Sequence, residues 1–256
     1  MHAELAIELH RTGDGVVVAR GDLARTPYWC RWDGTTLWIV GSAATPVGED
    51  DIALDLAVGE GVHAVVRSVA ATLVYAGRGA GTRLTTRLQV GSGASLLWQP
   101  EPVIVTARAR HRSVLVADVA VDGSLLADEV VVLGRSEEAA GAFASETDLR
   151  AAGASVCLTA FDTTVPGWSG PGGTDGAKVI GTRLALGTVA DGAGGPPDPH
   201  TAVLRPEGGG AIATTLAPDP DRARAQLDAK LAVPPSADRR LPTAGSDADP
   251  ALPVLV

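Results

Sequence analysis

The sequence Val58-Gly59-Glu60-Gly61 recurs as Val90-Gly91-Ser92-Gly93 and, in a partial copy, as Val121-Asp122-Gly123. The copies are spaced by 32 and 30 residues, and each stands between two alternating apolar stretches. A repeat of this length, with a strand, a glycine turn and a strand in each unit, is typical of strands stacked coil on coil. The sequence therefore predicts a mainly β, superhelical or β-helix-like fold in which the repeated positions are structural.

Outside these copies, turn and periodicity signals predict further strands and one helix. Hairpins are expected around Thr12–Gly15 and around Asp33-Gly34, because both pairs of flanks are apolar or aromatic. More strands are expected at 148–151, 155–162, 177–187, 201–205 and 210–216, whereas 136–147 and 187–199 are expected to be loops.

The end of the chain carries the only good helix signal. Asp219 and Pro220 supply cap and first-turn chemistry, and Leu227 and Leu231 are spaced four apart. We predict one β domain over 1–232 that includes a short helix at 219–231, followed by a Pro- and Asp-rich tail at 233–256 with too little to bury for a stable fold.

Composition excludes several classes of function. The 256-residue chain has a net charge of −9, which argues against binding to nucleic acid or to an anionic membrane. Its two cysteines form no disulfide framework, and it has neither a leader pattern nor an apolar run of membrane-spanning length. We expect a cytoplasmic protein whose partners are other proteins and cations.

No catalytic constellation emerges from the polar residues. The five histidines lack metal-binding spacing, so no tight zinc or nickel cage is predicted. The glycine-rich stretches 77–81 and 170–176 are not followed by Lys-Ser or Lys-Thr, so no nucleotide cradle is predicted either. We therefore expect the chain not to be an enzyme and to hold no tightly bound cofactor.

Two groups of charged residues remain as candidates. Arg108, Arg110 and Arg112 alternate, which places them on one strand face; that face is either simply solvated or a surface for an acidic partner or carboxylate network. Asp128 and Glu129 interrupt the apolar run 125–133, where an inward charge is costly unless it is paired. Glu129 is the best single functional candidate, although an outward carboxylate is the simpler account.

Several segments in order resemble the UreD family of urease accessory proteins, called UreH in some organisms. The matching segments are 70–75, Gly93–Pro102 (GASLLWQPEP), Arg108–Arg112, Asp128–Arg135 (DEVVVLGR), 167–171 and 176–182, so the resemblance covers about residues 50–220. No one segment is diagnostic, but their order and spacing are fairly specific.

The resemblance implies a non-enzymatic scaffold or chaperone in urease maturation. Such proteins bind UreF, which recruits the GTPase UreG, and the assembly delivers nickel to apo-urease. GTP is then bound by UreG and not by this chain, while Ni²⁺ passes through transiently along an internal path. Asp128 and Glu129 become candidates for that path, and Arg108, Arg110, Arg112, Arg222, Leu227 and Leu231 become candidates for partner contacts.

Two other hypotheses for the function remain open. A β-helix enzyme acting on polysaccharide would be expected to display acidic clusters and aromatic platforms along a cleft, whereas the carboxylates here are scattered and three of the five tryptophans cluster at 29–38. The second hypothesis is a ligand-binding β module, and no specific feature of the sequence favours it.

Overall fold

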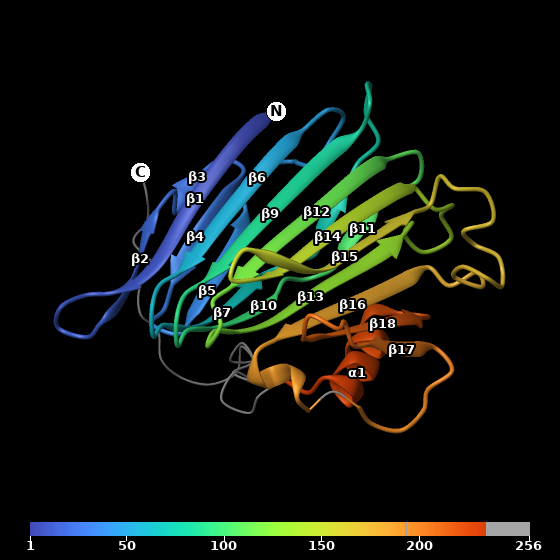
Figure 1. The fold of residues 1–256 in the computed structure, drawn as a ribbon. Coiled ribbons are helices and arrows are strands. Elements are labelled where there is room, and N and C mark those ends of the chain that lie inside the picture. The colour runs from blue at the N-terminus through green and yellow to red at the C-terminus, as the bar shows by residue number, and fades with distance from the viewer. Residues whose placement is uncertain (193, 234–256) are drawn as a thin grey trace, which may run out of the picture.

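The computed structural model describes residues 1–192 and 194–233. The predicted tail, 233–256, therefore lies outside the described residues from position 234 onward. Among the described residues, strands dominate and one short α-helix follows them, which confirms the predicted mainly β fold with a C-terminal helix (Figure 1).

The strands form two sheets. The seven-stranded sheet A contains, in spatial order, β15 (Ala154–Asp162), β14 (Ala142–Ala151), β12 (Arg110–Val119), β9 (Thr82–Val90), β6 (Asp51–Val58), β1 (His2–Arg11) and β2 (Val17–Gly21). The eleven-stranded sheet B runs through β17 (Thr201–Leu204), β18 (Ala211–Ala217), β16 (Val179–Leu186), β13 (Ser124–Leu133), β10 (Ser95–Gln99), β7 (His63–Ser68), β5 (Thr36–Gly41), β4 (Tyr28–Trp32) and β3 (Ala24–Arg25). Two short strands complete it, with β11 (Val103–Val105) beside β13 and β8 (Thr72–Val74) beside β11.

Each copy of the repeated glycine phrase connects a strand of sheet A to a strand of sheet B. The connected pairs are β6 and β7, β9 and β10, and β12 and β13, and equivalent strands pair in parallel. Gly61 and Gly93 have φ values of 63° and 60°, a region that favours glycine. The turns stack on one another, because the Gly61 N–H donates to the Ser92 carbonyl at 2.9 Å. The repeat therefore sets the coil-on-coil arrangement, as predicted.

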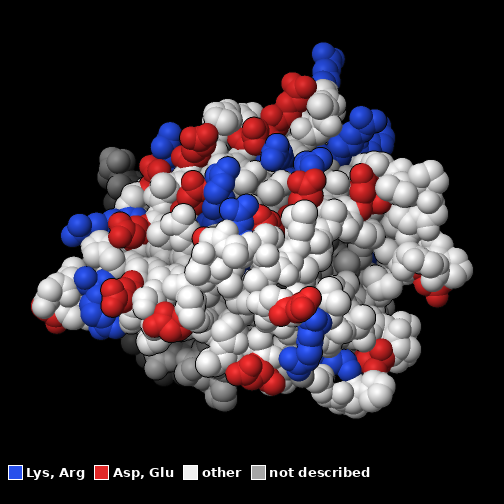
Figure 2. All heavy atoms as spheres, in the orientation of Figure 1, with Lys and Arg blue, Asp and Glu red and all other residues white. Residues whose placement is uncertain are grey.

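The main core fills the space between the two sheets. Alternate residues of every stacked strand point inward, as in β6, where Ile52, Leu54, Leu56 and Val58 are buried and Asp51 and Asp55 are exposed. This period-two burial removes one apolar face of each sheet from water. The outer face of sheet A instead carries basic and acidic side chains of mixed sign, such as the Arg87–Asp55 pair at 2.8 Å, and Figure 2 shows charges of both signs interspersed on the molecular surface.

Prolines interrupt the strands of sheet B at one level of the stack. Pro100 and Pro102 lack an N–H group and stand between the end of β10 at Gln99 and the start of β11 at Val103. The neighbouring coil breaks at the same level, between β7 and β8, and the Glu101 N–H is satisfied by the Ser68 hydroxyl at 2.7 Å. These breaks leave a gap in the ladder beside the continuous strand β13.

The helix α1 (Pro220–Lys230) covers part of the outer face of sheet B. Asp219 is its N-cap and accepts a hydrogen bond from the Arg222 N–H at 2.8 Å, as the sequence predicts. The helix packs on β16, β18 and β13, with Leu227 buried against Leu126 and Ala185. No helix among the residues described is long and apolar enough to cross a membrane.

Three expectations from the sequence are wrong in detail. Residues 142–147 are not a loop but the first part of β14, because their backbone pairs in parallel with β12 despite a composition that is small and acidic. The loop 187–199 contains a short 3₁₀ turn, η1 (Thr188–Ala190), which is anchored by the buried Ala190. Arg108 lies in a turn with φ of 64°, and β12 begins only at Arg110, so the three arginines do not share one strand face.

Candidate functional site

A cavity of about 400 Å³ lies between the two sheets, at the level of the strand breaks. Leu54, Leu84 and Leu115 line it from sheet A, and Trp98 lines it from sheet B. Its wall also includes the broken segments around Ser68–Thr72 and Pro100–Glu101, where the ladder of sheet B is interrupted. The lining is mainly apolar, and within residues 1–192 and 194–233 its charged members are the acids Glu101, Asp128 and Glu129.

Glu129 presents the carboxyl group of this cavity. Residues 125, 127 and 129 of β13 point between the sheets, because Leu125 and Ala127 belong to the main core. The Ser113 hydroxyl of β12 donates a short hydrogen bond to Glu129 across the sheets. Burial raises the pKa of Glu129 above its usual 4.5, against the opposing effect of the Ser113 hydrogen bond. The side chain keeps some accessible surface because it faces the cavity.

Asp128 points to the opposite face of β13, toward α1. Both of its carboxylate oxygens are held by Arg183 of β16, with Nε to Oδ1 at 2.6 Å and Nη2 to Oδ2 at 2.7 Å. Both side chains are buried, at 2% and 0% exposure, and Asp128 also accepts from the Gln99 amide at 2.9 Å. Because its oxygens are occupied by cationic and amide donors, Asp128 acts as a structural anchor in this arrangement.

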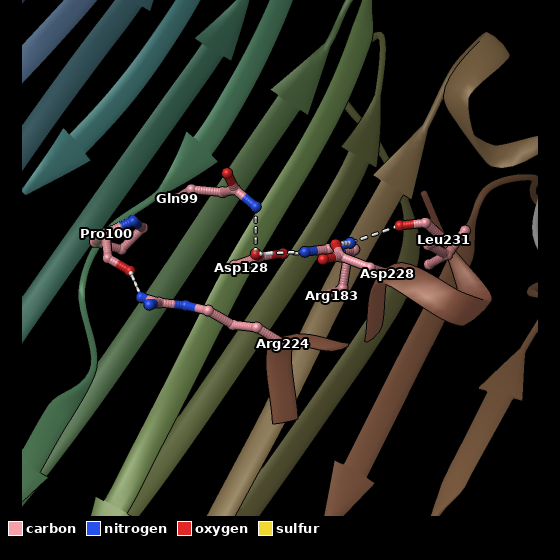
Figure 3. A network of polar contacts seen from close by, with 7 residues as sticks. All are labelled: Gln99, Pro100, Asp128, Arg183, Arg224, Asp228 and Leu231. Atoms are coloured by element: carbon pink, nitrogen blue, oxygen red, sulfur yellow. Dashed lines mark hydrogen bonds and ion pairs between the residues drawn. The ribbon is translucent and has the colours of Figure 1, made fainter. Parts of the chain in front are cut away.

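The same arginine fastens the end of the helix. Arg183 Nη1 donates to Asp228 and to the Leu231 carbonyl, each at 2.6 Å, so one guanidinium joins β13, β16 and the end of α1 (Figure 3). The Leu231 carbonyl is one of the groups that a helix C-terminus leaves unpaired. The network therefore fixes where α1 lies on sheet B.

A polar groove of about 550 Å³ runs between α1 and the outer face of sheet B. Arg67, Gln99 and Glu101 line it from the sheet, and Asp221, Arg224, Ala225, Asp228 and Val233 line it from α1 and the residues after it. Glu101 lines both this groove and the cavity between the sheets. The Glu101 side chain is therefore part of the wall of both hollows.

The partner-contact candidates fall into two groups. Arg108, Arg110, Arg112 and Arg222 are exposed, and Arg112 pairs with Glu146 of β14 on the outer face of sheet A. Leu227 and Leu231 are 0% and 1% exposed, so the expectation that they present a partner surface is wrong for the chain by itself. Their apolar side chains instead hold α1 on the sheet.

The structure adds residues that the sequence reasoning missed, namely Ser113, Arg183, Glu101, Arg224 and Asp228. Arg183 had a usable signal, since it is a lone charge in the apolar strand 179–186 and such a charge requires a partner. The other four are polar residues whose roles depend on which strands become neighbours. Among the described residues, no group of three or more His, Cys, Asp or Glu side chains could hold a metal ion.

Replacing Glu129 with glutamine is expected to stabilise the fold at neutral and alkaline pH. Because the folded-state pKa of Glu129 is raised, the folded chain binds more protons than the unfolded chain above pH 4.5, and its stability falls as pH rises through that window. Glutamine keeps an amide in place of the neutral carboxyl and does not ionise, so the gain is about 1–3 kcal/mol once Glu129 is ionised. Urea unfolding of both chains from pH 4.5 to 8.5 measures it; a difference that does not grow with pH would contradict the assignment.

Comparison with known proteins places the chain in a family. A family model described as UreD urease accessory protein matches residues 23–241. A protein named Urease accessory protein UreD from Parafrankia sp. (strain EAN1pec) is 32% identical, over 99% of this chain and 92% of its own length. Proteins of the same name from Frankia alni and Streptomyces coelicolor are 33% and 34% identical, each over 76% of this chain and over 72% and 79% of their own lengths. The chain therefore belongs to the UreD family of urease accessory proteins.

Proposed function

We propose that this chain is a non-catalytic scaffold for GTP-dependent insertion of nickel into apo-urease, acting with UreF and UreG and contacting urease itself. Membership of the urease accessory family supports a role in urease maturation. The cavity between the sheets, with the isolated carboxyl group of Glu129 in its wall, is the observation that carries the proposal for nickel. Nickel is the cargo of this path and not a resident cofactor.

The chemistry of the cavity suits transient rather than permanent binding. The Glu129 carboxylate beside the Ser113 hydroxyl offers Ni²⁺ two donor groups, fewer than a stable site provides. Passage requires a site that is favourable enough to enter and weak enough to leave. Burial raises the pKa of Glu129, so a cation that binds there stabilises the ionised carboxylate that burial disfavours.

Direction must come from a partner. The sequence carries no phosphate-binding motif with a following Lys-Ser or Lys-Thr, so the nucleotide belongs to UreG in this proposal. A GTPase can drive delivery if its two nucleotide states bind the assembly with different affinities. The exposed side of α1, which carries Arg222, is the surface that we assign to UreF.

Glu129→Gln tests the proposal directly. The variant retains the Ser113 contact and the shape of the side chain, so it is expected to fold, yet it cannot offer a carboxylate to Ni²⁺. In a host that expresses urease and the other accessory proteins but lacks its own UreD, nickel per urease active site should fall about tenfold, the effect of losing roughly 1.4 kcal/mol of interaction. Elemental analysis of purified urease and urease activity are the two readouts.

Glu8→Gln is the matched control, since Glu8 is an exposed carboxylate on β1. It should leave nickel loading unchanged. Normal loading with Glu129→Gln would remove the role assigned to the cavity. Normal loading in the complete absence of this chain would remove the scaffold function altogether.

A further inference from the structure

Arg224 of α1 reaches from the helix to the rim of the cavity. Its Nη2 donates to the Glu101 carboxylate at 3.0 Å and to the Pro100 carbonyl at 3.3 Å (Figure 3 draws the second contact). Both acceptors line the cavity between the sheets, and Arg224 itself lines the groove beside α1. The guanidinium therefore binds the one residue, Glu101, that lines both hollows.

The position of the contact follows from the strand break. Pro100 and Pro102 interrupt the ladder of sheet B, so the carbonyl of Pro100 and the side chain of Glu101 are available to a group outside the sheet. The Arg224 guanidinium donates hydrogen bonds to both of these groups. Arg183 fixes the position of α1 on sheet B through Asp228, one turn further along the helix, and so places Arg224 within reach of this break.

The charges at this junction oppose a passing cation. Of the cavity-lining residues in the part of the chain that the structure describes, none is basic, and Glu101 is the acid at the strand break. While Arg224 pairs with Glu101, it neutralises the carboxylate, so the pair no longer attracts a cation. The two side chains are only partly exposed, at 28% and 39%, so solvent screens the pair incompletely.

We propose that Arg224 is an electrostatic gate between the groove beside α1 and the cavity that contains Glu129. The inference rests on the proposed nickel path. With the Arg224–Glu101 pair formed, the Glu101 carboxylate is not available to divalent cations. A protein that docks on the exposed side of α1 and draws Arg224 away frees this carboxylate, which then attracts a divalent cation to the wall of the cavity. Arg224 acts through Glu101 and is a positioning residue.

Arg224→Met on the full-length chain is the test, with Ni²⁺ alone as the probe. The variant keeps an apolar stem against the helix but loses the charge, and Ni²⁺ affinity measured by titration calorimetry should rise about tenfold, since a unit charge close to a divalent cation has an effect of this size even in water. Arg224→Lys, which keeps the charge, should behave like the parent chain. Adding Glu101→Gln to Arg224→Met should remove the gain.

The control variant is Arg31→Met, which removes an exposed arginine of β4 that belongs to the lining of neither the cavity nor the groove. It should leave Ni²⁺ affinity unchanged. Equal affinities for Arg224→Met and the parent chain, or a gain that survives Glu101→Gln, would overturn the gate. Normal urease loading with Glu129→Gln would instead overturn the path itself, so the two failures are distinguishable.

Discussion

Arg183→Met is expected to lower the free energy of unfolding by about 3–5 kcal/mol, because it leaves Asp128 buried without a charged partner. The loss should be concentrated at α1, since the same guanidinium also holds Asp228 and the Leu231 carbonyl. Urea unfolding gives the total effect. Hydrogen exchange gives its location, and the amides of α1 should lose protection before those of β6 and β9.

The double variant Asp128→Leu with Arg183→Met separates pairing from packing. Replacing both partners of a buried ion pair with apolar residues is often neutral, so this chain should recover a large part of the loss. Recovery is incomplete because the Leu231 carbonyl still lacks its donor, which costs about 1–3 kcal/mol. A single variant within 1 kcal/mol of the parent chain, or a double variant less stable than the single, would contradict this role of the ion pair.

His111→Phe is expected to remove a loss of stability of about 3 kcal/mol between pH 6.5 and pH 4. His111 is 4% exposed, its Nδ1 lies 2.8 Å from the Thr82 hydroxyl, and its ring stacks on Phe143 with centroids 6.2 Å apart. Burial lowers the pKa of His111 from 6.5 to about 4. The unfolded chain therefore binds more protons in this window, and stability falls as pH decreases from 6.5 toward 4.

Thermal or urea unfolding as a function of pH measures this effect. The free energy of unfolding of the phenylalanine variant should fall less between pH 6.5 and pH 4, although this variant loses the Thr82 hydrogen bond at every pH. The control is His63→Gln, because His63 is exposed on β7 and its replacement should leave this pH dependence unchanged. Equal slopes for His111→Phe and the parent chain between pH 4 and 6.5 would show that His111 is not the buried titrating group.

Strand periodicity predicts part of the candidate site but not the partners of its charged residues. The apolar run around Asp128 and Glu129 indicated correctly that a charge there needs a partner, and strand alternation places the two side chains on opposite faces. The partners themselves, Arg183 for Asp128 and Ser113 for Glu129, are 55 and 16 residues away. Such contacts depend on which strands become neighbours.

For the helix, the sequence predicts the bounds but not what its apolar face contacts. Its cap residues and its leucine spacing were enough to predict α1 within a residue at each end. Local spacing does not reveal what the leucine face packs on. Leu227 and Leu231 were therefore expected to meet a partner protein, whereas sheet B already covers them.

Local chemistry alone determined the strands, the glycine turns, the helix cap and the stacked architecture, because turn residues and period-two alternation act over a few neighbouring positions. Three features depend on the tertiary structure. The strand breaks at Pro100 and Pro102 lie beside Glu129, Arg183 joins three elements, and Arg224 contacts Glu101 on the wall of both groove and cavity. The physical reason is that burial and charge pairing depend on distances between strands and a helix far apart in the chain. The repeat specifies the stack, and the contacts across it specify the site.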